Sequence, residues 1–346
     1  MSEQNQDQTI IERRNRKKKG KKRGLLLTLL LLLAASIIGV AGFTINKVNQ
    51  TLDKTYAPEP VGTGSFASGD EDAGKHRPFS MIILGRDTRP DLGTMNTDVM
   101  MLAIVDMQEK NVHLLSLPRD LKVEVPGYSG VHKINSVFAL GYLEEKRAER
   151  NHELVTETGT SLVKKTLSNQ LGIPIDYYAT IDFEGFKQVI DQLGGVDVYV
   201  DRNMRYHDPT DGTSINLQEG QQRLDGKNAL DFVRFRQSDD GDNSSDFDRN
   251  GRQQAVIRAL VDRLSSFDGM TKIYSVMDIV GDHVRRDIPN SLIKDLTFSF
   301  QDYGSDKIET IPNDAYWDSA SQATVIPDER LAAIQQELKE LMKLNR

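Results

Sequence analysis

Three short apolar runs decide the fold of this chain: FSMIILGRD (79–87), DVMMLAIVD (98–106) and NVHLLSLP (111–118). Each run has the length of a strand, is apolar over consecutive positions and is bounded by turn residues, a pattern typical of strands buried within a sheet. The sequence therefore predicts that three strands of a mostly central β-sheet open the folded body.

Helical and extended segments alternate after these strands. The segments 153–171 and 183–193 repeat apolar residues at helical spacing, whereas DYYATID (176–182) and VDVYVD (196–201) have the character of strands. Such alternation is typical of a layered α/β domain. Later segments extend the pattern, with helices expected at 246–266, 271–285 and 328–344 and a strand near 307–313.

The N-terminal region predicts a membrane anchor. Residues 24–45 contain no charged side chain and, at ~1.5 Å per residue, are long enough to cross a bilayer. Nine of the eleven residues from Arg13 to Arg23 are basic, which places the N-terminus in the cytoplasm and the body outside. A cleaved signal peptide is the alternative, but the apolar stretch exceeds the usual length and lacks an A-x-A site.

Composition limits the chemistry of the body. The 346 residues include no cysteine, which excludes disulfides and thiolate catalysis, and the six histidines are scattered, which disfavours a histidine-built zinc site. The net charge of −7 combines +7 in residues 1–50 with −14 in the remainder, which argues against a nucleic-acid partner for the body. Carboxylates and arginines must therefore carry any chemistry.

These patterns divide the chain into four segments. A basic cytoplasmic tail (1–23) precedes the transmembrane helix (24–45), and the Gly-, Ser-, Pro- and acid-rich stretch within 46–77 is typical of a flexible extracellular tether. Neither an internal repeat nor a second tether follows, so we expect 78–346 to form a single domain.

Two polar clusters lie at the ends of predicted strands. Asp87 ends one strand and Asp98 opens the next, and two such carboxylates suit Mg²⁺, although Asp is also a common turn residue. Arg119 and Asp120 follow a third strand, with Lys133 at an expected helix start. Loops at strand ends of α/β sheets commonly bind ligands, but Arg119 and Asp120 could equally form a local ion pair.

The third cluster surrounds an acidic loop. Arg234 and Arg236 share a face if their segment is extended and diverge if it is helical. On the following helix Asp246, Arg249 and Gln253 are spaced i, i+3 and i+7, and the same stripe continues into apolar residues. Asp246 could simply favour the helix N-terminus, but the triplet indicates a polar cavity. Converging arginines and a cation would together neutralise a pyrophosphate.

Several segments resemble the LytR-CpsA-Psr family of cell-wall ligases. The resemblance spans about 79–256, and the predicted tail and membrane helix are similar to the family layout. The segments that carry it are LGRDTRP, TDVMMLAIVD, SLPRDLKVEVPG, HKINSVFALG, DFEGFKQVIDQLGGVDVYVD, LDGKNALDFVRFRQ and DFDRNGRQQAVI.

The resemblance implies a three-layer α/β/α domain with an apolar tunnel for a polyprenyl tail, in the cell membrane of a Gram-positive-type envelope. Family members transfer a glycopolymer, such as teichoic acid or capsule, from undecaprenyl pyrophosphate to peptidoglycan. By the same resemblance, Asp87 and Asp98 would hold Mg²⁺ and Asp246 would be a base or an arginine orienter. The pyrophosphate ligands would be Arg119, Arg234, Arg236, Arg249 and Gln253.

Two departures and two alternatives accompany this interpretation. Val99 stands where the family commonly has Thr or Ser, and the loop 237–245 is longer and more acidic than usual. A lipid pyrophosphate hydrolase would use water in place of a sugar hydroxyl, whereas a regulator would bind the lipid without turnover. A cytoplasmic segment of about 23 residues without a helix-turn-helix argues against direct DNA binding.

Overall fold

The computed structural model describes residues 44–60, 77–87, 97–208, 212–241, 244, 246–299 and 307–344. The predicted cytoplasmic tail and nearly all of the predicted membrane helix lie outside these ranges, as does the end of the predicted tether before Arg77. Within the described ranges, helices are either too short or too polar to cross a bilayer.

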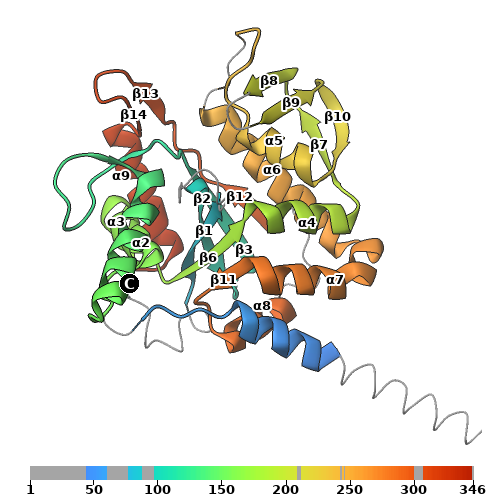
Figure 1. Cartoon of the computed structure of the whole chain (residues 1–346), viewed down its shortest axis with the longest axis horizontal. Helices are drawn as coiled ribbons and strands as arrows, with labels where there is room; N and C mark the ends of the chain where they lie inside the picture. The colour runs from blue at the N-terminus through green and yellow to red at the C-terminus, as the bar shows by residue number, and fades with distance from the viewer. Residues whose placement is uncertain are drawn as a thin grey trace, which may run out of the picture. The chain divides into compact units, whose positions relative to one another are not determined.

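The body has a mixed α/β fold (Figure 1). Its labelled elements, in chain order, are β1 (Phe79–Arg86), β2 (Thr97–Asp106), β3 (Asn111–Leu117), β4 (Lys122–Val123), β5 (His132–Lys133), α2 (Ile134–Asn151), α3 (Gly159–Leu171), β6 (Tyr177–Asp182), α4 (Phe183–Leu193), β7 (Val196–Val200), β8 (Met204–Asp208), β9 (Thr213–Leu217), β10 (Gly220–Leu224), α5 (Gly226–Arg234), α6 (Asp246–Ser265), α7 (Phe267–His283), β11 (Val284–Arg286), α8 (Asn290–Ser299), β12 (Ile308–Thr310), β13 (Tyr316–Asp318), β14 (Ala323–Val325) and α9 (Asp328–Leu341).

The central sheet has the strand order β11-β6-β1-β2-β3-β12. The first three strands form an antiparallel meander, and β6 and β12 add in parallel to β1 and β3 respectively. The predicted strands at 79–87, 98–106 and 111–118 are thus confirmed to within two residues. Because β1 and β2 are antiparallel, the end of β1 lies beside the start of β2, where Arg86 pairs with Thr97.

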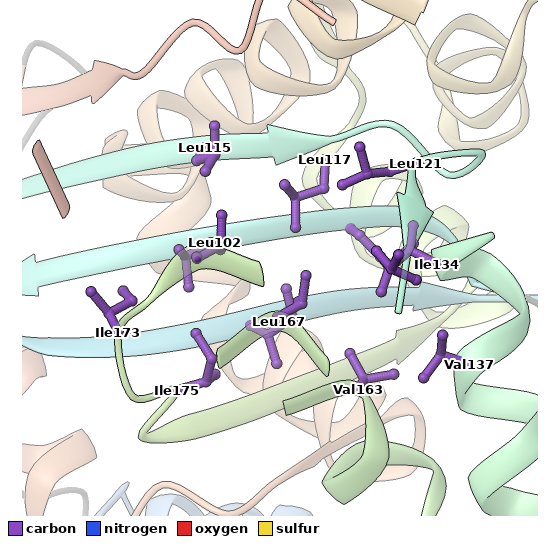
Figure 2. Close-up of a cluster of buried hydrophobic side chains, with 14 of the residues drawn as sticks. Leu102, Leu115, Leu117, Leu121, Ile134, Val137, Val163, Leu167, Ile173 and Ile175 are labelled. Carbon is purple, nitrogen blue, oxygen red and sulfur yellow. The ribbon is translucent and has the colours of Figure 1, made fainter. Parts of the chain in front are cut away.

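Alternate side chains of β1, β2 and β3 enter two different apolar cores. On one face, residues such as Leu102, Leu115 and Leu117 pack against α2, α3 and α9, and Figure 2 shows part of this core. On the other face, Met101 and Leu114 pack with Leu292 of α8. Figure 1 shows α2, α3 and α9 on one side of the sheet and α7 and α8 on the other. The consecutive apolar residues of the sequence reflect this burial on both faces.

A further core lies outside the central sheet. β7 pairs with β10 and β8 pairs with β9 in two small antiparallel sheets. Their apolar residues pack with α5 and with Val256 of α6, and Phe232 and Phe235 are almost completely buried there. The strand predicted at 196–201 therefore exists, but it belongs to this accessory layer. Its burial alternates, with Asp197 and Tyr199 exposed, as expected of a sheet covered on one face.

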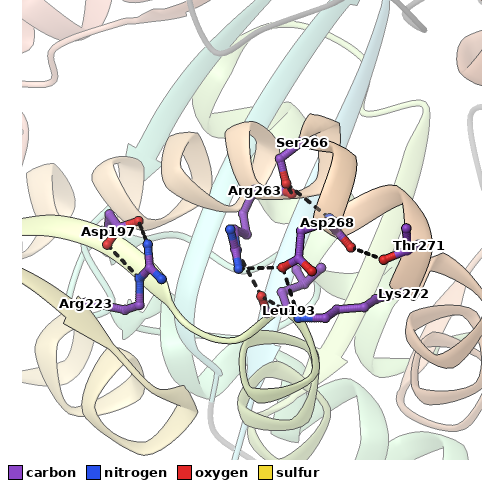
Figure 3. Close-up of polar contacts among 9 residues, drawn as sticks. Leu193, Asp197, Arg223, Arg263, Ser266, Asp268, Thr271 and Lys272 are labelled. Carbon is purple, nitrogen blue, oxygen red and sulfur yellow. Dashed lines mark hydrogen bonds and ion pairs between the residues drawn. The ribbon is translucent and has the colours of Figure 1, made fainter.

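Polar contacts fasten the end of α6 to α4 (Figure 3). The Arg263 Nε donates a hydrogen bond of 2.9 Å to the Leu193 carbonyl, which is left without a helical partner at the end of α4. Asp268 then pairs with Arg263 at 2.7 Å and with Lys272 at 3.0 Å. The Ser266 hydroxyl accepts from the Gly269 N–H and so caps α7. These contacts fix the helix whose opposite end forms part of the candidate site.

Part of the predicted tether is bound to the body. The Ala57 N–H donates to the Arg286 carbonyl at 2.7 Å, and the Arg286 guanidinium donates to the Leu52 carbonyl at 2.9 Å. The Thr158 hydroxyl donates to the Glu59 carboxylate at 2.6 Å. A flexible tether over 46–77 is therefore wrong for residues 51–60, because their backbone groups have specific partners on β11.

Some helix boundaries also differ from the sequence prediction. The segment predicted as one helix at 153–171 becomes helical only at Gly159, because Thr158 and Ser161 form a reciprocal capping box there. The helix predicted at 271–285 instead begins after the Ser266 cap and ends at His283, where β11 starts. In both places a side-chain cap, which apolar spacing does not encode, sets the start of the helix.

Candidate pyrophosphate site

One cavity of about 940 Å³ collects side chains from distant parts of the sequence. It lies where the start of β2, the loop after β3, the end of α5 and the start of α6 meet. Its lining includes most of the candidate residues together with an aromatic side chain from β13: Asp98, Arg119, Arg234, Arg236, Arg249 and Trp317. A cavity with several cations at its wall is suited to a polyanion.

Asp120 organises one side of this cavity. Its carboxylate accepts a 2.8 Å hydrogen bond from Arg236 and lies 3.6 Å from the Arg119 Nε and 3.5 Å from the Lys133 Nζ. Burial alone would raise the pKa of Asp120, but the three surrounding cations hold that pKa below its ordinary value. The carboxylate therefore stays ionised and orients these cations.

Asp98 holds the Arg119 guanidinium from the opposite side. The Arg119 Nη1 donates a 2.8 Å hydrogen bond to Asp98 Oδ1. Burial lowers the pKa of Arg119, but Asp98 and Asp120 outweigh burial and raise the pKa above its ordinary value. The ion pair predicted between Arg119 and Asp120 exists, as one link in a larger network that lines the cavity.

The two predicted metal ligands converge on Arg234. The Arg234 Nε lies 3.4 Å from Asp98 Oδ2, and its Nη2 lies 4.0 Å from Asp87 Oδ2. The antiparallel pairing of β1 and β2 explains why carboxylates eleven positions apart share one cation. The same guanidinium lies 4.9 Å from the ring centroid of Phe183 at the start of α4. Asp87 and Asp98 thus both lie within 4.0 Å of the same guanidinium.

These carboxylates fit Mg²⁺ by their chemistry. Mg²⁺ binds oxygen ligands and commonly takes one or two carboxylates, with water and substrate phosphate oxygens completing its shell. Across the described ranges, no group of three or more His, Asp or Glu side chains could hold a metal by itself. A site built on Asp87 and Asp98 would therefore depend on the substrate for further ligands.

Arg234 and Arg236 adopt neither of the two geometries considered from the sequence alone. Helix α5 begins at the Asp225 cap and ends at Arg234, and Phe235 has φ −56° and ψ 128°. The chain thus leaves the helix between the two arginines. Phe235 lines the cavity together with both arginines, but it is 1% exposed and packs in the accessory core. Burial of this ring therefore sets the direction of its two neighbours.

The start of α5 is fixed by close backbone packing. Gly226 lies so near α4 that a Cβ at this position would meet the Lys187 carbonyl oxygen at 2.2 Å. The Gly226 N–H donates a 2.7 Å hydrogen bond to Asp191 of α4. A glycine is required here because only it permits this approach, and the approach holds the helix that ends in Arg234.

The first turns of α6 are unusually polar for a buried helix. Arg249 and Gln253 are 2% and 4% exposed, and Arg249 lines the cavity. The predicted inward-facing stripe is therefore confirmed for these two residues. Within the described part of the chain, the Gln253 Oε1 has no hydrogen-bond partner. Asp246 is the first residue of α6, but its side chain lies outside the described structure.

Arg252 is a residue of this region that the sequence analysis missed. Its Nε and Nη2 each donate a 2.7 Å hydrogen bond to the carboxylate of Asp201, and its Nη1 donates to the Phe235 carbonyl at 3.2 Å. The guanidinium also lies 5.4 Å from the Phe235 ring centroid. Arg252 thus fastens the residue between Arg234 and Arg236. Its i+3 spacing from Arg249 was visible, but its partner at the end of β7 was not.

Comparison with known proteins agrees with this fold. The profile of the LytR_cpsA_psr family matches residues 43–340. The chain therefore belongs to the LytR_cpsA_psr family, as its sequence motifs indicated.

Among curated relatives, the polyisoprenyl-teichoic acid–peptidoglycan teichoic acid transferase TagU of Halalkalibacterium halodurans is 28% identical over 322 residues, covering 90% of this chain and 94% of TagU. The regulatory protein MsrR of Staphylococcus aureus is 33% identical over 235 residues, covering 67% of this chain and 63% of MsrR. The crystal structure of Bacillus subtilis TagV is similar with a TM-score of 0.59 at 27% identity, covering 77% of this chain and 98% of that structure.

Proposed function

We propose that this protein is a phosphotransferase that moves a glycopolymer, such as teichoic acid, from an undecaprenyl pyrophosphate carrier to peptidoglycan. The product is a phosphodiester between the glycopolymer and a peptidoglycan sugar. Support comes from the transferase name of the TagU relative, with which 90% of this chain aligns. The observation that carries the proposal is the convergence of four arginines on one cavity: Arg119, Arg234, Arg236 and Arg249.

The arginines are suited to bind a pyrophosphate. Guanidinium groups match phosphate oxygens in a bidentate manner and remain charged at all physiological pH values. Asp98 and Asp120 hold Arg119 and Arg236 in place before substrate binds, so little reorganisation is needed. Gln253 is buried on the same face of α6 as Arg249 and is not among the residues that line the cavity. In this proposal its amide would contact a phosphate oxygen once substrate is bound.

The reaction requires alignment and charge neutralisation more than covalent catalysis. A hydroxyl oxygen of the acceptor sugar attacks the phosphorus that carries the glycopolymer, forming a new P–O bond. The bond from that phosphorus to the bridging oxygen breaks, and undecaprenyl phosphate leaves. In this proposal Asp246 accepts the hydroxyl proton or orients Arg249, while the arginines stabilise the charge that develops on the phosphoryl oxygens.

Asp87 and Asp98 would hold Mg²⁺ in this scheme. When bound, Mg²⁺ supplies positive charge that neutralises phosphate oxygens and polarises the phosphoryl group. Arg234 lies beside both carboxylates, so it balances their charge and limits their movement.

The proposed location follows from the N-terminal sequence. Residues 24–45 would form a single membrane-spanning helix and anionic lipids would attract the basic tail, leaving the body outside the cell. That topology places the cavity in the compartment that contains peptidoglycan. An apolar tunnel for the polyprenyl tail, implied by the family resemblance, remains part of this proposal.

A non-catalytic regulator is the second candidate, favoured by the printed name of the MsrR relative. Such a protein would bind a polyprenyl pyrophosphate in the same cavity without turnover, whereas a hydrolase would release inorganic or glycan phosphate in the absence of an acceptor. Adding a sugar acceptor to the purified protein and the lipid-linked donor separates these outcomes.

The proposal is tested by measuring transfer with Asp87→Asn and Asp98→Asn. Each variant should lose most Mg²⁺-dependent transfer while remaining folded, since Asn keeps the shape but removes the charge that a hard cation requires. Asp268→Asn on the α6–α7 turn is the matched control and should transfer normally. Full activity of both site variants would show that Asp87 and Asp98 do not hold a required metal. Absence of transfer by the wild type would contradict the transferase proposal and favour the regulator.

A further inference from the structure

The hairpin β13–β14 places an exposed aromatic residue at the cavity. Trp317 pairs with Thr324 across the hairpin, and the turn is held by Asp318, which accepts from the N–H groups of Ala320 and Ser321, each at 3.1 Å. These contacts give the short hairpin a defined conformation. The position of Trp317 is therefore set by the backbone of the hairpin.

The hairpin is also joined to the cation network. The Thr324 N–H donates a 2.9 Å hydrogen bond to the Asp120 carbonyl, and Leu121 forms a parallel bridge with Thr324. Asp120 is the residue whose carboxylate binds Arg236 and faces Arg119. One residue thus positions both the phosphate-binding cations and the hairpin that carries Trp317.

Trp317 is half exposed even though it is a large aromatic side chain. It is 46% exposed, lines the cavity and lies with its ring centroid 5.1 Å from the Lys133 Nζ. Lys133 lies in turn 3.5 Å from Asp120, so the ring is two side-chain contacts from the guanidinium cluster. The preceding residue, Tyr316, projects from the opposite face of the strand and is not among the residues lining the cavity.

We propose that Trp317 is a stacking platform for a pyranose ring next to the bound pyrophosphate. The inference rests on the proposed transferase function and adds a glycan subsite to it. One face of a pyranose presents C–H groups, which pack against the electron-rich face of an indole. The Lys133 Nζ lies over the Trp317 ring, 5.1 Å from its centroid, and can donate hydrogen bonds to hydroxyls of a sugar bound beside the indole. The ring could belong to the glycopolymer of the donor or to the peptidoglycan acceptor, and these share the same chemistry.

The sequence provides a direct reporter, because Trp317 is the single tryptophan of the chain. Its fluorescence in the whole protein is titrated with chitotetraose as an acceptor-like glycan and with farnesyl pyrophosphoryl N-acetylglucosamine as a donor-like probe. A saturable shift to shorter wavelength with either probe supports the subsite. No change with either probe, at concentrations where the donor-like probe is bound by calorimetry, overturns it. Tyr316→Ala keeps the tryptophan and should titrate like the wild type.

Kinetics of Trp317→Ala identify which substrate contributes the ring. We expect the KM of that substrate to rise about tenfold with kcat little changed, and Trp317→Phe to restore most of the loss because a smaller aromatic face remains. A rise for the donor alone assigns its sugar, and a rise for the acceptor alone assigns peptidoglycan. If the wild type transfers and Trp317→Ala keeps both KM values, the subsite is wrong. If the wild-type fluorescence saturates with a glycan but no transfer occurs, the transferase proposal fails and the subsite stands.

Discussion

The two ends of helix α6 carry the same kinds of side chain in opposite surroundings. At its start, Arg249 and Arg252 are 2% and 3% exposed. At its end, the Arg263 side chain is 20% exposed and pairs with Asp268, which is 50% exposed. Burying a guanidinium costs several kcal/mol unless its hydrogen bonds are replaced, whereas a surface pair costs and contributes little. We therefore expect the arginines of the first turns to contribute to activity or stability, and the arginine of the last turn to contribute little to either.

Replacing Arg249 should give the largest effect on activity. Arg249→Lys keeps the charge but loses the planar fork, so we expect a loss of ~1 to 3 kcal/mol of transition-state stabilisation in glycopolymer transfer. Transfer rate and melting temperature are measured on the same purified variant. A lowered melting temperature with normal turnover per folded molecule would assign Arg249 to a structural ion pair with Asp246, and Asp246→Asn should then show a similar loss of stability.

Arg252 should affect stability more than Arg249 does. Arg252→Met retains packing against the accessory core but removes two of the hydrogen bonds to the Asp201 carboxylate, which keeps the 3.3 Å bond from Arg202, and leaves the Phe235 carbonyl without the Arg252 donor. We expect a decrease of about 2 to 3 kcal/mol in the free energy of unfolding, less than for a fully buried pair because Asp201 is partly exposed. Urea denaturation measures this change. An unchanged midpoint would show that the buried guanidinium contributes nothing to holding Phe235.

Acid should weaken the Asp120 network in a defined range. The folded-state pKa of Asp120 is depressed, so its contribution to stability is complete above the unfolded pKa of ~3.9 and is lost as the pH falls through the folded value. The difference in melting temperature between wild type and Asp120→Asn should be constant above about pH 5 and shrink below about pH 4. A difference that instead changes between pH 6 and 8 would assign the effect to another group.

The far end of α6 should give the smallest effect. Arg263→Ala removes an exposed pair with Asp268 and one bond to the Leu193 carbonyl. We expect a shift in melting temperature close to the reproducibility of the measurement and smaller still in high salt, with normal transfer. A large loss of transfer in this variant would mean that the two ends of α6 are coupled and that the end of the helix also contributes to activity.

The sequence predicted those parts of the molecule that depend on local pattern. Apolar runs located β1, β2 and β3, and helical spacing placed Arg249 and Gln253 on one buried face. The sequence placed Asp87 and Asp98 at the ends of two neighbouring strands. It did not predict that both lie beside Arg234, because that depends on pairing between strands, which spacing does not encode.

Contacts between distant segments account for most of what the sequence did not predict. Arg252 meets Asp201 fifty-one positions away, and Trp317 reaches the cavity on a hairpin whose Thr324 is bonded to Asp120. The bound segment at 51–60 was misinterpreted because its composition is polar and rich in proline. Composition indicates whether a segment can bury enough apolar surface to form a core of its own. It does not indicate that a polar segment is held by backbone hydrogen bonds to another strand, as this segment is held to β11.

The binding of residues 51–60 to the body shortens the free connection between the predicted membrane helix and the body. A flexible linker over the 32 residues of 46–77 would have an end-to-end distance of about 30 Å. The Thr51 hydroxyl already donates to the Met277 carbonyl of the body at 3.4 Å. The stretch from residue 45 to that point spans at most ~20 Å even when fully extended. For a chain anchored as proposed, this short connection would limit how far the body can move from the bilayer. The polymer would then be attached to peptidoglycan close to the membrane, and inserting residues between 45 and 51 would increase the distance from the membrane at which attachment occurs.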